Sequence, residues 1–201
     1  MIAKRKTVCR LFRVGEWYDS EIPLLILPAL YILILTNGIW SGQQLCAVVM
    51  LTVFDCLFLA FGYLINDYSD LEVDRLAGKK KVMHAIPRQA AFLMVVLSAA
   101  AGCLSVLVIS HSGFTVLWLA VIYFFGAFYS ARPLRFKERG IWGWLVSSTA
   151  QHCFPLFLIP LLMGVSADLF FGCGCCSVFL SACGIFWYTS TLMRKMTGKQ
   201  V

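Results

Sequence analysis

The sequence predicts an all-α fold, a polytopic transmembrane helical bundle of about six spans. Hydrophobic residues make up 60% of the 201 positions and charged residues 13%, which is about half the fraction of charged residues in soluble domains. The apolar residues also gather in long windows, each able to cross a hydrocarbon core of about 30 Å as a helix. These observations make lipid the main solvent of the surface and exclude a soluble globular protein.

The apolar windows follow one another along the chain, separated by polar segments. They lie at residues 23–40, 45–65, 90–109, 114–131, 141–163 and 169–188. The first window follows a basic segment, but it is long and has no clear small-x-small cleavage site, so we expect an uncleaved span rather than a signal peptide. The chain then divides into a basic N-terminal segment at 1–21, the helical bundle at 22–190 and a tail at 191–201. The first of these suits either a short interfacial helix or a disordered tail.

Every Lys and Arg lies in one alternating set of segments. All 17 fall within 1–21, 66–89, 132–140 and 191–201, whereas the turns at 37–44, 110–113 and 164–168 contain none. Because positive residues mark cytoplasmic loops, we predict a multi-pass integral membrane protein with both termini and the two long loops in the cytoplasm. The net charge of +7 is therefore a topology signal. Nucleic-acid binding is excluded, since it needs a folded basic face or a known motif.

An acidic motif, NDYSDLEVDR from Asn66 to Arg75, follows the second window directly. Asn66, Asp70 and Asp74 are four residues apart each time, so on a continuous helix they project from one face, with Asp67 beside them. A row of carboxylates repels itself unless a hard cation neutralises it. Oxygen-only ligands favour magnesium, which shares its coordination sphere with substrate phosphates. The motif therefore predicts magnesium and a diphosphate at these four residues.

Basic side chains on both long loops could complete this anion site. They are Arg75 at the end of the acidic motif, Lys79, Lys80 and Lys81 after it, and Arg132, Arg135 and Lys137 on the next loop. Ammonium and guanidinium groups bind phosphate through charge-assisted hydrogen bonds. For the three consecutive lysines, topology signalling by positive charge is an equally good interpretation.

Two motifs together resemble the UbiA superfamily of intramembrane prenyltransferases. Asn-Asp-x-x-Asp-x-x-x-Asp at 66–74 is similar to the first aspartate-rich motif of that family. YSARPLRFK, from Tyr129 to Lys137, is similar to its second recognisable element, a tyrosine followed by basic residues at the end of the fourth span. The resemblance covers about residues 10–165, including Arg13 before the first span, and weakens beyond.

The resemblance implies the first two-thirds of a nine-helix bundle and a defined reaction. A polyprenyl group passes from a magnesium-bound prenyl diphosphate to a lipid-soluble or interfacial acceptor, after magnesium and cationic side chains have stabilised the departing diphosphate. The implied magnesium ligands are Asn66, Asp67, Asp70 and Asp74, the groups facing the diphosphate or the forming cation are Tyr129, Arg132 and Lys137, and further substrate-binding residues are Arg13, Lys79 and Arg135.

The chain departs from the family pattern in its last part. Family members have about nine spans and a second aspartate-rich motif after the sixth, whereas residues 169–201 here contain no Asp or Glu. We consider a shortened or frameshifted relative, a partner chain that completes the second metal site, and a protein that binds a lipid diphosphate without turnover. We expect low transfer activity from the chain alone.

Other functions fit parts of this pattern. A CDP-alcohol phosphotransferase also has acidic residues at a helix end, but its Asp-Gly-x-x-Ala-Arg opening is absent, and Leu71 follows Asp70. A non-catalytic membrane subunit is an alternative, as is a small transporter that uses Asp55 as an ion site. An ionised aspartate near mid-membrane costs about 2.5–3.5 kcal/mol, so we expect Asp55 to be protonated or hydrogen-bonded, with Gln151 and His152 as neutral partners.

Overall fold

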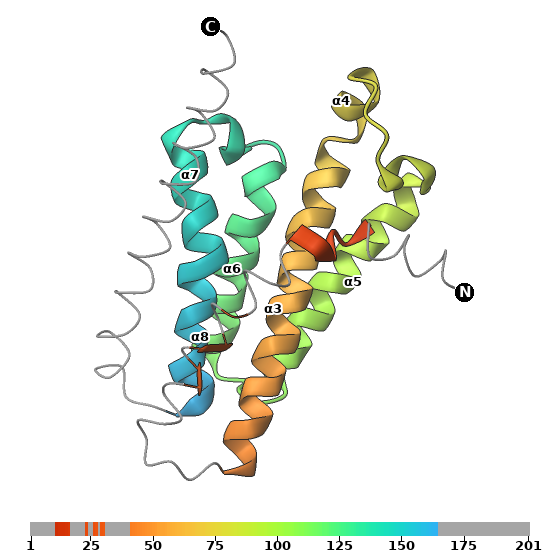
Figure 1. Ribbon diagram of the computed structural model, residues 1–201. Coiled ribbons are helices and arrows are strands. Elements are labelled where there is room, and N and C mark those ends of the chain that lie inside the picture. Colours follow the sequence, from red (N-terminus) through yellow and green to blue (C-terminus); the bar gives the residue numbers. More distant parts are fainter. Residues whose placement is uncertain (1–10, 17–22, 24–25, 28, 31–40, 165–201) are drawn as a thin grey trace, which may run out of the picture.

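The structure is a computed structural model that describes residues 11–16, 23, 26, 27, 29, 30 and 41–164, and its regular elements are all helices (Figure 1). They are η1 (Val14–Glu16), α3 (Gly42–Ser69), α4 (Leu71–Leu76), η2 (Val82–Ala85), α5 (Arg88–Leu107), α6 (Gly113–Ser130), η3 (Phe136–Glu138), α7 (Ile141–Ser148), the π-helical turn η4 (Thr149–Cys153) and α8 (Phe154–Met163).

Four segments of this part are long and apolar enough to cross a membrane: α3, α5, α6 and the continuous Ile141–Met163, made of α7, η4 and α8. They coincide with the windows predicted at 45–65, 90–109, 114–131 and 141–163, so the all-α helical bundle is confirmed. The predicted span at 169–188 and most of the one at 23–40 lie outside the described residues.

The longest helix, α3, positions the acidic motif. Its start is fixed by a capping box, in which the Gln44 N–H donates to Ser41 Oγ and the Ser41 N–H donates to Gln44 Oε1, each at 3.2 Å; this satisfies helix-end donors. The helix has 28 residues, or about 42 Å at 1.5 Å per residue. That exceeds a hydrocarbon core of about 30 Å, so the helix is long enough to cross it and still carry the acidic motif to its end.

The acidic motif spans a break between two helices. α3 ends at Ser69, Asp70 follows with φ −96° and ψ 5°, and the short α4 begins at Leu71. Helical backbone hydrogen bonds continue across the break, from the Asp70 N–H to Asn66 O at 3.1 Å and from the Asp74 N–H to Asp70 O at 2.8 Å. The carboxylates therefore stay close along the chain. The four-residue spacing had predicted one uninterrupted helix for them, and this prediction is wrong because the helix is interrupted at Asp70.

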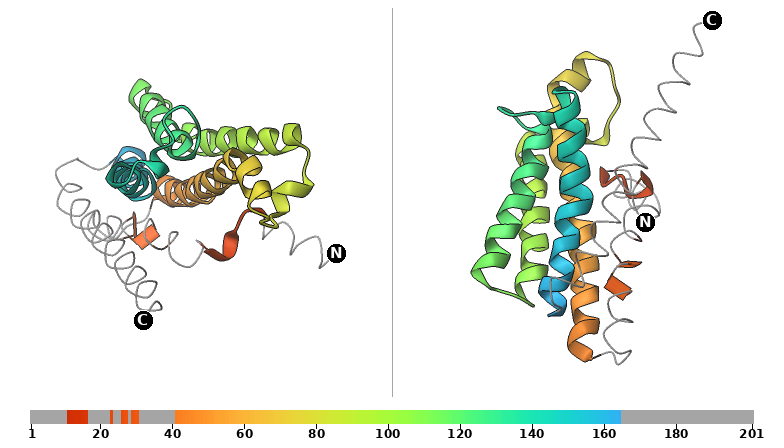
Figure 2. Two further views of the ribbon diagram at one scale, coloured as in Figure 1. Left: turned by 90° about the horizontal axis from the view of Figure 1, so that it is seen from above. Right: turned by 90° about the vertical axis from the view of Figure 1, so that its left-hand side faces the viewer.

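The helix α3 is the centre of the bundle. It packs along α5 and also contacts α6 and α8, as the view from above in Figure 2 shows. Buried apolar side chains fill these contacts, among them Leu51, Phe54 and Leu64 from α3, Val95 from α5 and Ile122 from α6. Interdigitation of this kind fixes where each helix ends relative to its neighbours, and so aligns the loops that carry charge.

A close approach holds the loop after α6 against α7. A Cβ atom at Gly143 would lie 2.6 Å from the carbonyl oxygen of Phe136 and 3.1 Å from Cα of Lys137. Only glycine leaves room for this contact, because real Cβ atoms do not approach backbone atoms so closely. Gly143 therefore sets the position of η3 and of Lys137.

All Lys and Arg residues between positions 41 and 164 lie at one end of the described bundle. Loops 66–89 and 132–140 lie at the same end, where α4 is seen in Figure 1. The opposite end is formed by the start of α3, residues 108–112 and Gly164, and these segments carry no Lys or Arg. Asp55 is 4% exposed within α3. This polarity matches the charge pattern of the sequence, and the cytoplasmic location of the charged end stays a prediction.

Candidate functional site

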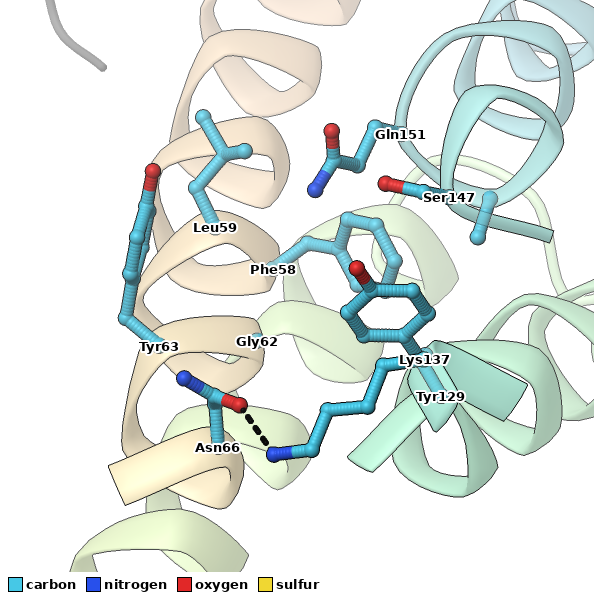
Figure 3. A pocket seen from close by; sticks show the side chains of 11 residues that line it. Phe58, Leu59, Gly62, Tyr63, Asn66, Tyr129, Lys137, Ser147 and Gln151 are labelled. Carbon is cyan, nitrogen blue, oxygen red and sulfur yellow. Dashed lines mark hydrogen bonds between the residues drawn. The ribbon is translucent and has the colours of Figure 1, made fainter. Parts of the chain in front are cut away.

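A cavity of about 270 Å³ lies between α3, α6 and α7, next to the charged loops (Figure 3). It is lined by Phe58, Leu59, Gly62, Tyr63, Asn66, Gly126, Tyr129, Lys137, Ser147, Ala150 and Gln151. Asn66 and Lys137 form one polar end, and Ser147 and Gln151 approach from α7 and the π turn (Figure 3). Apolar walls with a few polar groups suit a ligand that has a hydrocarbon part and a polar head.

Lys137 joins the second loop to the acidic motif in what we term the Lys137 cluster, composed of Asn66, Asp70, Ser130, Arg135 and Lys137. Its Nζ donates to Asn66 Oδ1 at 2.9 Å and to Asp70 Oδ2 at 2.5 Å. Ser130 Oγ also donates to Asn66 Oδ1, at 2.9 Å, and Arg135 Nη2 donates to Asp70 Oδ1 at 2.8 Å. Both oxygens of Asp70 are therefore neutralised by cations that arrive from more than 60 residues away along the chain.

A second group, the Lys81 cluster, is composed of Arg13, Asp67, Asp74, Lys79 and Lys81. Lys81 Nζ lies 2.6 Å from Asp67 Oδ1 and 2.6 Å from Asp74 Oδ2. Lys79 Nζ lies 2.9 Å from Asp74 Oδ1, and Arg13 Nη1 lies 4.0 Å from Asp67 Oδ1. The side chains of Asp67 and Asp74 are 8% and 4% exposed. One ammonium thus bridges two nearly buried carboxylates.

The charges of the Lys81 cluster support each other. The hydrogen bond from Lys81 is the main cause that lowers the pKa of Asp74 from 3.8 to about 2, against the opposing effect of burial. For Lys81, burial lowers the pKa of the ammonium, but its hydrogen bonds to Asp67 and Asp74 outweigh burial and raise that pKa above its usual value. Asp74 and Lys81 are therefore both ionised at neutral pH.

The predicted row of oxygen donors is thus divided, with Asn66 and Asp70 in one cluster and Asp67 and Asp74 in the other. Within the described part of the chain, no three His, Cys, Asp or Glu side chains are grouped so that they could hold a metal ion. The donor chemistry nevertheless fits magnesium, which prefers carboxylate and amide oxygens. The position of Lys81 Nζ further shows that Asp67 and Asp74 can share a single cation.

The remaining predicted site residues fall in different places. Tyr129 lines the cavity. Arg13 lies over the ring of Tyr63, 4.7 Å from its centroid, and so reaches the cavity wall as well as Asp67. Arg132 does not line the cavity; it lines a groove outside it together with Arg135. The cavity and the two clusters therefore gather most of the predicted residues, but not Arg132.

Three polar side chains that line the cavity, those of Tyr63, Ser147 and Gln151, were not predicted as site residues. Tyr63 carries no motif signal in the sequence. Ser147 and Gln151 are four residues apart, which places them on one side of a helix, and this spacing is the signal that could have identified them. The π turn that includes Gln151 could not be read from the sequence, although such turns are frequent at functional sites.

The comparisons with known proteins agree with this arrangement. A model of the UbiA prenyltransferase family matches residues 25–199. The chain belongs to the UbiA family. The match continues well beyond residue 165, so the family relationship extends further than the motifs suggested, while Arg13 lies before its start. No curated protein and no solved structure matches the chain.

Proposed function

We propose that this membrane prenyltransferase-like protein transfers a polyprenyl group from a magnesium-bound prenyl diphosphate to a lipid-soluble or interfacial acceptor. The cavity carries the proposal. It joins an apolar wall, including Phe58 and Leu59, to a polar end formed by Asn66, Tyr129 and Lys137. A prenyl diphosphate likewise consists of an apolar hydrocarbon chain joined to a polar diphosphate head.

The two clusters supply the polar chemistry in this proposal. Asn66, Asp67, Asp70 and Asp74 would hold magnesium, which when bound neutralises charge on the diphosphate. Among the described residues, Lys137 is the cation that lines the cavity itself, and it would orient the diphosphate by donating to a phosphate oxygen. Arg135 would support this position through Asp70. The aromatic ring of Phe58 and the other apolar walls would exclude water from the prenyl chain.

Binding without turnover is a second candidate function. It is favoured by the absence of Asp and Glu from residues 169–201, because prenyltransferases of this family use a second aspartate-rich motif. Both functions require the same diphosphate site. A transfer assay with the labelled prenyl diphosphate separates them, once binding has been established.

The binding test is titration of a fluorescent prenyl diphosphate into the detergent-solubilised chain, with magnesium and with chelator. Asp70→Asn and Asp74→Asn keep the size of the side chain and remove the charge. If magnesium bridges carboxylate and phosphate, each variant loses at least about tenfold in affinity, or about 1.4 kcal/mol. Direct contact between cations and phosphate predicts unchanged or tighter binding instead, because carboxylate repulsion is removed.

Glu72→Gln is the matched control. Glu72 belongs to the same motif, but its side chain is 80% exposed and forms its ion pair, at 3.5 Å, with Arg88, which belongs to neither cluster. We expect affinity within about twofold of wild type, and thermal unfolding of each variant checks that it is folded. Equal binding by wild type in magnesium and in chelator contradicts the proposed metal bridge.

A further inference from the structure

A groove of about 300 Å³, here called the arginine groove, lies on the charged end of the bundle outside the cavity. Four arginines line it, Arg75, Arg88, Arg132 and Arg135, together with Tyr68 and Ile86 among others. It shares no lining residue with the cavity. Asp70 lies between the two spaces, because one of its oxygens accepts from Arg135 and the other from Lys137.

The arginines of the groove are unequally neutralised. Arg135 is paired with Asp70 at 2.8 Å and with Glu138 at 2.6 Å, so its charge is balanced. Arg88 and Glu72, which also lines the groove, form a loose, exposed pair at 3.5 Å. Arg75 donates to a backbone carbonyl, that of His84, at 3.2 Å.

Arg132 and Arg75 provide the surplus charge of the groove. Within the described part of the chain, Arg132 forms no ion pair or hydrogen bond, and Arg75 has no carboxylate partner. Both side chains belong to exposed residues. Two guanidinium groups that line one groove without a carboxylate of their own repel each other, and an anion between them would remove that repulsion.

The groove has the depth and composition of a site at the membrane surface. Arg88 is the first residue of α5 and Tyr68 lies in the last turn of α3, so both mark the point where apolar helices meet polar loops. Tyrosine is enriched at this level of a membrane, and Ile86 adds apolar surface. Guanidinium groups bind phosphate oxygens in pairs, and basic pockets between transmembrane helices bind anionic headgroups.

We propose that the arginine groove binds a phosphate group at the membrane surface, at a site separate from the cavity. Its phosphate comes from the headgroup of an anionic phospholipid or from free diphosphate in solution. Arg75 and Arg132 supply the charge, and Tyr68 and Ile86 contact the apolar part of a lipid. Because Arg135 lines the groove and also donates to Asp70, the occupant lies one side chain away from the Asp70 carboxylate.

Paired double variants test this proposal. Arg75→Gln with Arg132→Gln removes two charges from the groove. Lys80→Gln with Arg139→Gln removes the same charge from the same two loops, at exposed residues that do not line the groove. Arg132→Gln alone, which breaks no hydrogen bond or ion pair with a described residue, serves if the first pair affects folding. Thermal unfolding confirms that each protein is folded.

The lipid arm uses the full chain in nanodiscs of phosphatidylcholine with a minor share of phosphatidic acid, and native mass spectrometry counts the lipids that stay bound. The soluble arm titrates inorganic diphosphate in chelator, with phosphatidylcholine as the only lipid. We expect wild type to bind phosphatidic acid in preference to phosphatidylcholine, or to bind inorganic diphosphate. The Arg75→Gln/Arg132→Gln variant should lose at least tenfold in affinity for this anion, and the Lys80→Gln/Arg139→Gln variant should stay within twofold of wild type.

The two arms identify the source of the phosphate. Loss confined to the lipid arm assigns a lipid headgroup, and loss confined to the diphosphate arm assigns a soluble anion; loss in both supports a general phosphate site. Equal losses in the groove and control pairs, or no anion preference in wild type, overturn the proposal, because the arginines then act only as general surface charge.

Discussion

Replacement of Lys81 by glutamine tests how the acidic motif is held together. The substitution removes the ammonium that lies 2.6 Å from both Asp67 Oδ1 and Asp74 Oδ2, while Lys79 stays 2.9 Å from Asp74. Two nearly buried carboxylates then lose their shared counterion. Because a charge left without its partner in a buried site is costly, we expect the variant to be less stable than wild type in the absence of magnesium.

The size of the effect follows from the pKa of Asp74. Its lowering from 3.8 to about 2 corresponds to about 2 kcal/mol of stabilisation of the ionised form, and the hydrogen bond from Lys81 is the largest single cause of it. For a chain of this length, a loss of this size lowers the melting temperature by roughly 4–8 °C. The direction in which folding stability changes with pH also follows from this pKa. A lowered carboxyl pKa stabilises the fold above pH 3.8, and this stability is lost as the pH falls toward 2.

The assay is thermal unfolding of the detergent-solubilised protein, followed by tryptophan fluorescence in chelator and across a magnesium titration. Lys81→Gln should melt earlier than wild type in chelator. It should also gain more from magnesium, with at least tenfold tighter apparent affinity, because the ammonium no longer occupies the position between Asp67 and Asp74. Lys80→Gln is the matched control, since it removes the same charge from the neighbouring exposed residue. Identical melting and identical magnesium dependence in all three proteins refute this reasoning.

Three further predictions concern packing and topology. Gly143→Ala should displace the η3 turn, because the new Cβ would lie 2.6 Å from a backbone oxygen there; it should cost about 1–3 kcal/mol of stability and weaken diphosphate binding. Gly42→Ala is the control, since its Cβ would meet nothing within 4 Å, and it should have neither effect. Equal melting temperatures of the two variants would contradict the close contact at Gly143. Gly102→Ala should destabilise the chain because its Cβ would overlap the Tyr123 hydroxyl, so Tyr123→Phe in the same chain should restore most of the lost melting temperature; no rescue would show that the clash lies elsewhere. A reporter inserted after Ser112, in a turn without Lys or Arg, should behave as external, and a cytoplasmic signal there would reverse the proposed orientation.

The described spans were accessible from the sequence because their signal is local. A helix in lipid must satisfy its own backbone hydrogen bonds and present apolar side chains, so length and hydropathy alone located α3, α5, α6 and Ile141–Met163. The acidic motif was equally visible, since carboxylates at the end of an apolar helix are conspicuous. The family relationship followed from two such local motifs, and the family match supports it.

The partners of each charged side chain were not accessible in this way. The four-residue spacing predicted one row of oxygen donors from Asn66 to Asp74. In the structure, basic side chains divide these donors into two clusters. The contacts that do so in the Lys137 cluster are long-range, since Lys137 is 71 residues from Asn66 and 67 from Asp70 in the sequence. Such contacts depend on where the second loop is placed by the packing of Gly143 against η3, which no local pattern encodes.

The sequence by itself therefore determined the helices, the charged end of the bundle and the residue types available for chemistry. Only the tertiary structure decided that Lys81 bridges Asp67 and Asp74, that Gln151 reaches the cavity, and that Arg132 lies in a separate groove. The physical reason is that helix formation and membrane insertion are governed by each segment, whereas the neighbours of a side chain are set by how whole helices pack.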